Sequence, residues 1–522
     1  MSRTFPQALC AVLFALVITT SSLSATTYYI AANGSDSNNG TSKTSPWLHA
    51  PGMNGCAGLC ASTTPGPGDQ FILRGGDTWG PSNFDVWMWS WSGSSGNSVY
   101  IGVDKTYYSG ASWARPIMSG GGAPNGVYKF LELGSGVSNV TVDNLEWTGM
   151  YSTLSSPQSG QVDYIDISRN INQHIHIENN YFHGGNVAHD GAHAAHFLIA
   201  SMGSGDSSNE VDHNVFDNSD ICKASNPPVL GGPTCTIDAV EGTIWSFHDN
   251  YVGYFSCGYV TDWATLIYEN TMEVIVLSPD NGTDHENGVE NNGGTGVLMF
   301  NNVIQHFVNA GIVDFQLAPV SSASYAFNNV LPDMDGGNME QCYEGSPANN
   351  HCAWFNNTAE AGPDSGNPSG TCGRNTGGNT TSAVTNQHCI TSAGGTSWWQ
   401  GSATFTTNLA QSKMTANSQG YSNSNTYAFS PTSASGSTVG AGTNMSNTCA
   451  TISSLNALAG TACMQDTTYG VTYNKSSHSI TGPGRANTNS RPASGAWDIG
   501  AYQFSGSGQP PSPPTGLAAS VQ

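Results

Sequence analysis

Five carboxylates occupy similar places in this sequence, each near the end of a short apolar run. They are Asp166 in YIDIS, Glu241 in AVEG, Asp262 in YVTD, Glu290 in GVEN and Asp314 in IVDF. Two carboxylates held about 5 Å apart can cleave a glycosidic bond with retention, and a wider pair at about 6.5–9.5 Å can cleave it with inversion. Like charges at such distances also raise one pKa, which turns one carboxyl group into an acid and its neighbour into a base. The pattern predicts acid–base chemistry, with Glu241, Asp262 and Glu290 as catalytic candidates.

Two further segments gather histidines and acids. HGGNVAHDGAHAAHF contains Asp190 and His193, and SPDNGTDHENGVE contains Asp284 and His285. A histidine within reach of a carboxylate can act as a general base or orient a water molecule, so His193 and His285 join the catalytic candidates. Asp190 and Asp284 are candidates for binding substrate. The alternative is that these are surface residues of glycine-rich loops.

Other roles are open for the same residue types. The carboxylates could instead hold Ca²⁺, which takes six to eight oxygen ligands, and Asp166 and Asp314 are the candidates for this. Trp263, next to Asp262, could stack on a sugar ring. The carboxylates could also be independent, solvated residues at strand ends, because an alignment across unequal loops can slip by one residue. The alternating Trp87, Trp89 and Trp91 fit either a sugar platform or a buried layer.

A repeated sequence motif predicts the strands that would position these carboxylates and histidines. An apolar stretch, a polar residue, Asn and a hydrophobic pair recur at intervals of 20 to 36 residues, around Asn144, Asn180, Asn214, Asn250, Asn270, Asn302, Asn329 and Asn357. Short strands of constant pattern with variable loops predict a solenoid of about ten to twelve coils. Its parallel strands would lie about 4.8 Å apart, so equivalent carboxylates in adjacent coils would meet. The Asn is expected in the bend after each strand, since it tolerates left-handed geometry. A β-propeller is disfavoured because it needs a more regular repeat.

Both ends of the chain carry a resemblance. TTYYIAANGSDSNNGTSKTSPW (26–47) resembles the N-terminal segment of many secreted bacterial right-handed parallel β-helix proteins of the pectate-lyase-like superfamily. RPASGAWDIGAYQF (491–504) is similar to the closing DIGAY-type segment of the same proteins, although Gln503 stands where an acid is more usual. The resemblance covers residues 26 to about 505. It implies an all-β, single-stranded right-handed parallel β-helix that acts on extracellular polysaccharide.

The reaction is left open by this resemblance, because the superfamily holds lyases, hydrolases, epimerases and non-enzymatic surface proteins. Lyases of this fold use a Lys or Arg base. Between Arg115 and Arg374 the sequence offers only Lys129, Arg169 and Lys223, and no spacing places them beside the acids. We therefore expect a glycoside hydrolase slightly more than a polysaccharide lyase. The alternative is a non-catalytic surface, matrix or glycan-binding protein.

Composition restricts the partners. A formal net charge of −23 argues against nucleic acid, because phosphate binding needs a basic surface. It also opposes polyuronates unless a cation such as Ca²⁺ bridges the two acidic partners. We expect a monomer that binds extracellular polysaccharide. Its sequence requires no cofactor, and Ca²⁺ is the candidate that it allows.

The termini and the cysteines indicate export. Residues 1–25 read as a signal peptide, with Arg3, an apolar run and small residues before Ala25, so no membrane contact is expected after cleavage. Residues 26–505 would form the β-helix domain with long loops, and residues 506–522 a Pro/Ser-rich flexible tail. Ten cysteines form sequence-near couples that predict disulfides, at 56–60, 222–235, 342–352, 372–389 and 449–463, while Cys257 is left as a buried thiol. The protein is expected to be secreted.

Overall fold

The computed structural model describes most of the chain between residues 25 and 506. The residues outside the description are 1–24, 85, 123–128, 153–161, 170–171, 188–194, 201–207, 223–236, 262–265, 276–286, 293–295, 308–309, 317–322, 333–337, 345–351, 361–371, 376–381, 392–398, 402, 424–426 and 507–522. The predicted signal peptide and tail lie almost entirely among them. No helix within the described ranges is long and apolar enough to cross a membrane.

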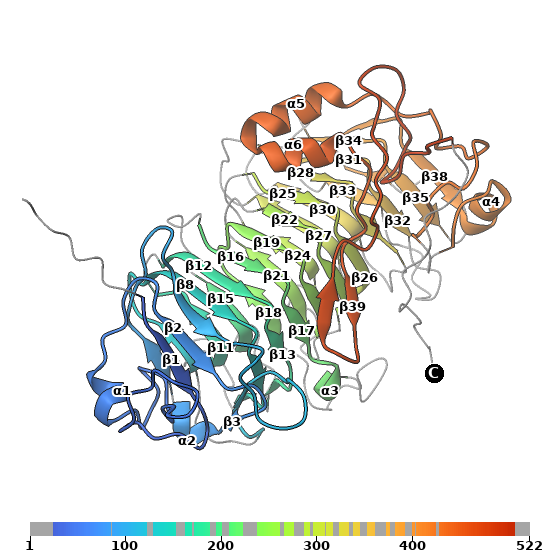
Figure 1. Cartoon of the computed structure of the whole chain (residues 1–522). Coiled ribbons are helices and arrows are strands. Elements are labelled where there is room, and N and C mark those ends of the chain that lie inside the picture. Colours follow the sequence, from blue (N-terminus) through green and yellow to red (C-terminus); the bar gives the residue numbers. More distant parts are fainter. Residues whose placement is uncertain are drawn as a thin grey trace, which may run out of the picture.

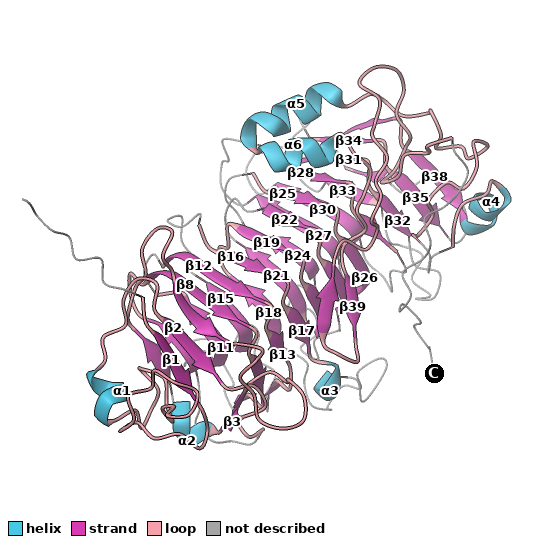
Figure 2. Ribbon diagram, in the orientation of Figure 1, coloured by secondary structure: helices cyan, strands magenta, loops and turns pink. Residues whose placement is uncertain are grey.

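Three long parallel sheets form the body of the molecule (Figures 1 and 2). The thirteen-stranded sheet consists of β1 (Thr27–Ile30), β2 (Gln70–Leu73), β5 (Val99–Gly102), β8 (Ser138–Asp143), β12 (Gln173–Glu178), β16 (Glu210–Asp212), β19 (Ser246–His248), β22 (Leu266–Tyr268), β25 (Leu298–Phe300), β28 (Ser324–Phe327), β31 (Cys352–Phe355), β34 (Ala383–Thr385) and β37 (Thr404–Thr406). The twelve-stranded sheet consists of β3 (Thr78–Trp79), β6 (Ile117–Ser119), β9 (Glu146–Thr148), β13 (Tyr181–Phe182), β17 (Val215–Asp217), β20 (Tyr251–Phe255), β23 (Thr271–Ile275), β26 (Val303–Phe307), β29 (Val330–Leu331), β32 (Thr358–Glu360), β35 (His388–Thr391) and β38 (Leu409–Ser412).

The eleven-stranded sheet completes each coil. It consists of β4 (Trp87–Trp89), β7 (Lys129–Leu133), β11 (Val162–Ile167), β15 (Ala195–Ala200), β18 (Asp238–Glu241), β21 (Cys257–Thr261), β24 (Asn287–Asn291), β27 (Ala310–Gln316), β30 (Asn338–Glu344), β33 (Gly373–Asn375) and β36 (Trp399–Gln400). Successive strands of the chain visit the three sheets in turn, and parallel connections of this kind are right-handed. The chain is therefore a right-handed parallel β-helix, as predicted.

The remaining elements are short and peripheral. β10 (Tyr151–Ser152) pairs with β14 (Asn186–Val187), and β39 (Thr472–Asn474) forms an antiparallel hairpin with β40 (Ser479–Thr481). The helices are α1 (Gly58–Ser62), α2 (Pro81–Phe84), α3 (Ser219–Cys222), α4 (Lys413–Ser418), α5 (Ser446–Leu455) and α6 (Ala457–Cys463). In Figure 1, α5 and α6 cover the late strands of the thirteen-stranded sheet. They bury a stack of rings there, formed by Tyr268, Phe300, Phe327 and Phe355.

The interior of the coils is a continuous apolar core. Side chains at equivalent positions stack along the helix axis, as in the buried series Trp147, Phe182 and Phe216. Trp87 and Trp89 are fully buried in this core, so they form a capping layer of the first coils and not a sugar platform. Strand residues that alternate between this core and the outside position polar groups on the outer faces of the sheets.

The repeated asparagines form a buried ladder that joins the coils. Asn214 N–H donates to the side-chain oxygen of Asn250 at 2.9 Å, and Asn250 N–H donates to that of Asn270 at 3.0 Å. The ladder runs from Asn180 to Asn357 with the same geometry. The left-handed backbone predicted for these asparagines is found one residue earlier, for example at Asp249 with φ of 52°. The expectation was wrong because the side-chain amide of each asparagine is needed as a hydrogen-bond partner for buried backbone groups of the neighbouring coil. The left-handed bend is formed by the residue before it.

The first repeat departs from the others. Asn144 lies at the bend with φ of 58° and aligns with Asn179, since Glu146 pairs with Tyr181. Leu145 occupies the ladder position, and its N–H donates to Asn180 Oδ1 at 3.0 Å. The ladder therefore begins one coil later than the sequence phrase indicates.

Removing one amide from the ladder should destabilise the protein measurably. Asn250→Ala deletes an acceptor for Asn214 N–H and a side-chain amide that donates to Val211 and His248 carbonyls at 2.9 and 2.8 Å. Buried groups left without partners cost about 1–3 kcal/mol each, so we expect a loss of about 2–4 kcal/mol in the free energy of unfolding. Urea unfolding monitored by circular dichroism measures it. The control Asn447→Ala changes an exposed helical residue and should stay within about 0.5 kcal/mol of wild type.

Four of the five predicted disulfides are present. They join Cys56 to Cys60, Cys342 to Cys352, Cys372 to Cys389 and Cys449 to Cys463. The predicted partner of Cys222, Cys235, lies outside the described residues. Cys257 is buried, as predicted.

The C-terminal segment returns along the outer face of the twelve-stranded sheet. Val471 exchanges hydrogen bonds with Thr271, and the Tyr473 hydroxyl donates to Asp217 at 2.7 Å. The Tyr473 ring stacks on Tyr251 with centroids 4.0 Å apart. Figure 1 shows the β39 hairpin lying along β26 and reaching towards β17. Residues more than 200 positions apart thus clamp adjacent coils together.

Beside this hairpin, a histidine links stability to pH. His183 Nδ1 lies 2.9 Å from Asp220, and its Nε2 lies 3.2 Å from Glu146. Burial by itself lowers the pKa of His183, but the two carboxylates more than offset it and raise the pKa to about 9. Because the pKa is raised on folding, the stabilisation is complete below the ordinary value of 6.5 and is lost as the pH rises towards 9.

We expect the stability difference between wild type and His183→Gln to shrink by about 2 kcal/mol between pH 6 and pH 9. Urea unfolding of both proteins across this interval measures it. A difference that stays constant over the interval would contradict the assigned ion pairs.

Candidate functional site

The eleven-stranded sheet carries ionisable side chains in two columns that run across its strands. The first column consists of Lys129, Asp163, His196 and Asp238. The second consists of the acids Glu132, Asp166, Glu241 and Glu290, with the apolar residues Ile199 and Val260 at the positions between them. The paired register omits Tyr164 and Phe197, whose rings are buried in the core. Lys129 contacts carboxylates of both columns, so Asp163 and Asp166, which are three residues apart on one strand, face the same side.

The predicted alignment of carboxylates holds for Asp166, Glu241 and Glu290, which share the second column. It fails for Asp314, which pairs with Asn291 and is therefore one residue out of register. β27 also lies five strands from β11, or about 24 Å at the usual spacing. Asp166 and Asp314 are therefore too far apart to share one Ca²⁺ ion, and a Ca²⁺ site at either residue stays a prediction.

Six predicted site residues lie outside the described part of the chain. They are Asp190, His193, Asp262, Trp263, Asp284 and His285. Their roles stay predictions.

A cationic group, which the sequence had not placed, lies against the acids. Lys129 Nζ forms an ion pair with Asp166 and lies 3.9 Å from Glu132 and 4.0 Å from Asp163. Arg169 forms an ion pair with Glu132. The expectation that no basic residue neighbours the carboxylates was therefore wrong. Lys129 is 34 residues from Asp163 in sequence, and the parallel register alone brings the two together.

His196 connects the two columns. Its Nδ1 lies 2.9 Å from Asp163 Oδ1, and its Nε2 forms an ion pair with Glu241. His193, from the same segment, was the predicted residue, because the sequence does not show which of these histidines enters the strand. The position of His196 three residues before the carboxylate column, equivalent to that of Asp163 and Asp238, was the available signal.

Burial and charge set the protonation of this pair. Asp163 and His196 are both fully buried. Burial raises the pKa of Asp163 to about 6, against the opposing effect of His196. Burial alone would lower the pKa of His196, but Glu241 and Asp163 raise it well above its ordinary value. A protonated His196 thus holds the carboxylate of Glu241 in a fixed position.

Glu241 and Glu290 lie two coils apart in one column, with Val260 between them. The strand spacing sets the two positions about 10 Å apart, near the upper end of the separation of inverting glycosidases. Asn287 Nδ2 donates to Glu290 Oε2 at 2.6 Å. Both carboxylates are therefore fixed by a partner of their own, and the short side chain of Val260 separates them.

Among the described residues of this sheet, one group of three side chains could ligate a metal ion. His196, Asp238 and Glu241 offer ligand atoms that all lie within 4.8 Å of one another. The imidazole favours a transition metal over Ca²⁺ at that triad. Asp166 is a poor Ca²⁺ ligand in this arrangement, because the Lys129 ammonium already occupies its carboxylate.

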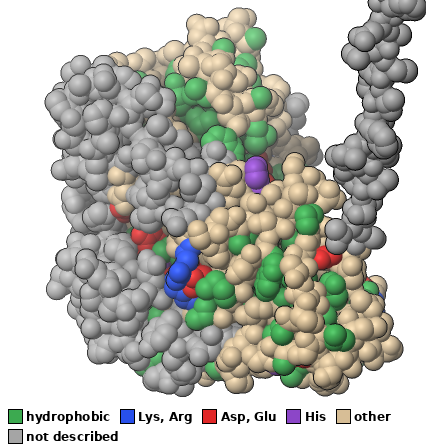
Figure 3. Space-filling view, turned by 90° about the vertical axis from the view of Figure 1, so that its left-hand side faces the viewer, with side chains coloured by type: hydrophobic (Ala, Val, Ile, Leu, Met, Phe, Trp, Pro, Cys, Tyr) green, Lys and Arg blue, Asp and Glu red, His purple; other side chains and the backbone are tan. Residues whose placement is uncertain are grey.

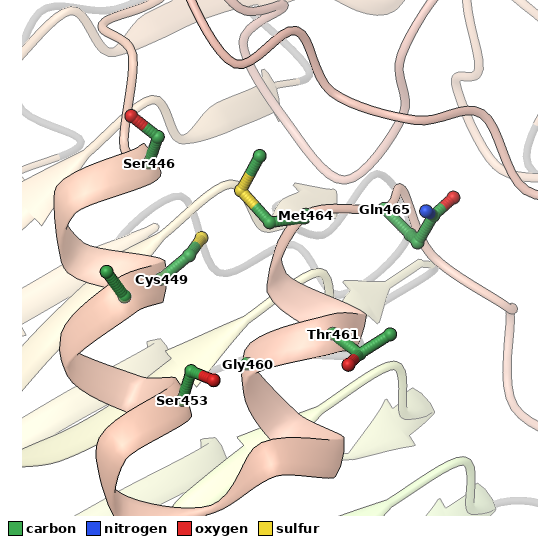
Figure 4. Close-up of a pocket in the computed structure, with 8 residues that line it drawn as sticks. Ser446, Cys449, Ser453, Gly460, Thr461, Met464 and Gln465 are labelled. Atoms are coloured by element: carbon green, nitrogen blue, oxygen red, sulfur yellow. The ribbon is translucent and has the colours of Figure 1, made fainter.

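A hollow of about 460 Å³ lies elsewhere, between α5 and α6 (Figure 4). Ser446, Ser453, Thr461, Met464 and Gln465 are among the residues that line it. The described lining residues carry no carboxylate, imidazole or basic group. Acid–base chemistry is therefore better placed on the eleven-stranded sheet. Figure 3 shows how few charged side chains one end of the described surface exposes, with Lys or Arg beside Asp or Glu in one small group.

Comparisons with known proteins return structures only. No family model and no curated protein matches the chain. A GH136 lacto-N-biosidase from Eubacterium ramulus aligns with a TM-score of 0.44 and 14% identity over 74% of this chain and 67% of that chain. A rhamnogalacturonan lyase aligns with a TM-score of 0.39 and 14% identity over 70% and 87%. A pectate lyase aligns with a TM-score of 0.39 and 14% identity over 93% and 98%. The three parallel sheets define the fold independently of these likenesses.

Proposed function

We propose that this chain is an extracellular carbohydrate-active enzyme that hydrolyses glycosidic bonds of a polysaccharide. The observation that carries the proposal is the pair Glu241 and Glu290, two coils apart on one outer face and each held by a fixed partner. This spacing leaves room for a glycosidic bond and a water molecule between the two carboxyl groups.

One carboxyl group acts as the general base and the other as the general acid. Glu241, which lies against the charged His196, removes a proton from the attacking water. Glu290 donates a proton to the glycosidic oxygen, which leaves with the bonding electrons as water attacks the anomeric carbon on the opposite face. The anomeric configuration is inverted, and the two carboxyl groups have exchanged protonation states. Asp163 supports this arrangement through His196, whose Nδ1 lies 2.9 Å from its carboxylate, and we assign it no contact with substrate.

Elimination is the second candidate, because Lys129 and Arg169 lie beside the acids. Arg169 is half exposed and could meet a uronate carboxylate. Lys129 is a weaker candidate for the base, since its amine would first have to leave the ion pair with Asp166. The net charge of −23 also repels acidic glycans, so a neutral polysaccharide is the favoured substrate.

Incubation of the purified mature protein with neutral and acidic polysaccharides tests the proposal. Each reaction is run with Ca²⁺ and with chelator. New reducing ends from a neutral glycan, without the absorbance near 235 nm of an unsaturated uronate, are expected. Reducing ends with that absorbance would establish elimination. Absence of products across a broad panel would favour a structural or glycan-binding role.

A further inference from the structure

A second cluster of histidines and carboxylates lies on a different face, the outer side of the thirteen-stranded sheet. His176 and Glu178 come from β12, Glu210 and Asp212 from β16, and His248 from β19. The register pairs His176 with Glu210, and it aligns Glu178, Asp212 and His248 in one column. The proposed hydrolysis uses none of these residues. We name these five residues the histidine–carboxylate patch.

Within the patch, three side chains converge as metal ligands do. Glu210, Asp212 and His248 offer one ligand atom each, and these atoms all lie within 4.8 Å of one another. His248 Nε2 lies 2.9 Å from Glu210 Oε1. Three protein ligands and a water molecule complete a tetrahedral zinc site, whose donor atoms lie about 3.3 Å apart for bonds of about 2.0–2.1 Å. Binding of an ion there requires small side-chain rotations and release of the proton between His248 Nε2 and Glu210.

Groups behind these three side chains hold them in the required orientation. His248 Nδ1 lies 2.8 Å from Asp249 Oδ2, so the other ring nitrogen faces Glu210. A carboxylate that holds one ring nitrogen, so that the other faces the ion, is typical of metal-binding histidines. The His248 ring also stacks on Tyr268, with centroids 4.5 Å apart. Asp212 is fixed in turn by an ion pair with His176.

Access and charge fit a cation that arrives from solvent. The side chain of Glu210 is 46% exposed, whereas those of Asp212 and His248 are 9% and 10% exposed. The exposed carboxylate can capture the ion and deliver it to the two buried ligands. Imidazole with carboxylates favours Zn²⁺ or a similar transition metal over Ca²⁺, which takes oxygen ligands.

We propose that the histidine–carboxylate patch binds one divalent transition-metal ion of the Zn²⁺ class, ligated by Glu210, Asp212 and His248. Asp249 and His176 are positioning residues that act through His248 and Asp212. The ion joins adjacent coils through β16 and β19, so it stabilises the folded chain by mass action.

Equilibrium dialysis of the untagged full-length protein against Zn²⁺ tests the assignment. His248→Gln should weaken binding at the patch by about 100-fold or more, and Asp249→Asn should weaken it by about 10–100-fold. Zn²⁺ should also raise the unfolding temperature of wild type and leave that of His248→Gln unchanged. The control His174→Gln, which changes an exposed histidine of β12, should retain the ion at the patch.

Two results would overturn the proposal. One is the absence of stoichiometric Zn²⁺ binding by wild type at micromolar free ion. The other is equal Zn²⁺ retention by wild type and His248→Gln. If circular dichroism shows that His248→Gln does not fold, Glu210→Gln decides in its place, since its side chain is partly exposed and its loss is tolerated more readily.

Discussion

Replacing Glu241 by glutamine is expected to lower the turnover number for polysaccharide cleavage by about 10²- to 10⁴-fold. The amide keeps the size of the side chain but can no longer take a proton from water. Glu290→Gln should lose activity to a similar extent, because an amide cannot protonate the leaving oxygen. Initial rates of reducing-end formation on the glycan that wild type cleaves measure both effects.

The matched control is Glu273→Gln, on β23 of the twelve-stranded sheet. Glu273 accepts a hydrogen bond from the Tyr251 hydroxyl at 2.9 Å and belongs to a different outer face. Its variant should retain the wild-type rate. Full activity in both Glu241→Gln and Glu290→Gln, with folding intact, would remove the pair from the mechanism and return attention to Glu132 and Asp166.

Replacing Lys129 by methionine is expected to destabilise the fold by about 3–5 kcal/mol. The change removes the cation that contacts Asp166 and lies within 4.0 Å of Asp163 and Glu132, while the carboxylates stay buried. Breaking a buried ion pair from one side carries a penalty of this size, because the remaining charge is left uncompensated. Urea unfolding at pH 7 measures the loss.

Two further variants separate this effect from a general loss of charge. Lys43→Met removes an ion pair with Asp104 in which both side chains are about one-third exposed, so it should cost at most about 1 kcal/mol. The double variant Lys129→Met/Asp166→Asn should recover much of the stability lost in Lys129→Met. A loss of less than 1 kcal/mol in Lys129→Met would show that water compensates the carboxylates.

The fold could be predicted from the sequence because the repeated motif of each coil is local in the chain. Each repetition, such as IHIENNYF around Asn180, contains a strand, a bend and the start of the next strand, so the solenoid can be read without knowing any long-range contact. The same locality explains the errors within the repeat. Asn144 and Asn180 look alike in sequence, but only the Asn180 side chain bonds the backbone of the preceding coil, at the Leu145 N–H and the Val142 carbonyl.

The site depends on the register between neighbouring strands of the eleven-stranded sheet, which the sequence predicts only in part. Asp166, Glu241 and Glu290 could be aligned because each ends a similar apolar run, whereas Asp314 lies one residue beyond the equivalent position. The position of Lys129 beside the acids was missed because Asp163 and Asp166 lie a full coil further along the chain. The sequence does not show which residues of two successive coils pair. Asp163 and Asp166 face the same side although they are three residues apart on one strand, which the regular alternation of a strand does not predict.

We propose that Glu241 and Glu290 act from opposite faces of the sugar. Proton NMR of the reaction in its first minutes, on the glycan that wild type cleaves, tests this proposal because it identifies the first product formed. We predict a reducing sugar whose anomeric configuration is opposite to that of the bond cleaved. The same configuration as the bond cleaved, or the vinyl proton of an unsaturated uronate, would contradict it.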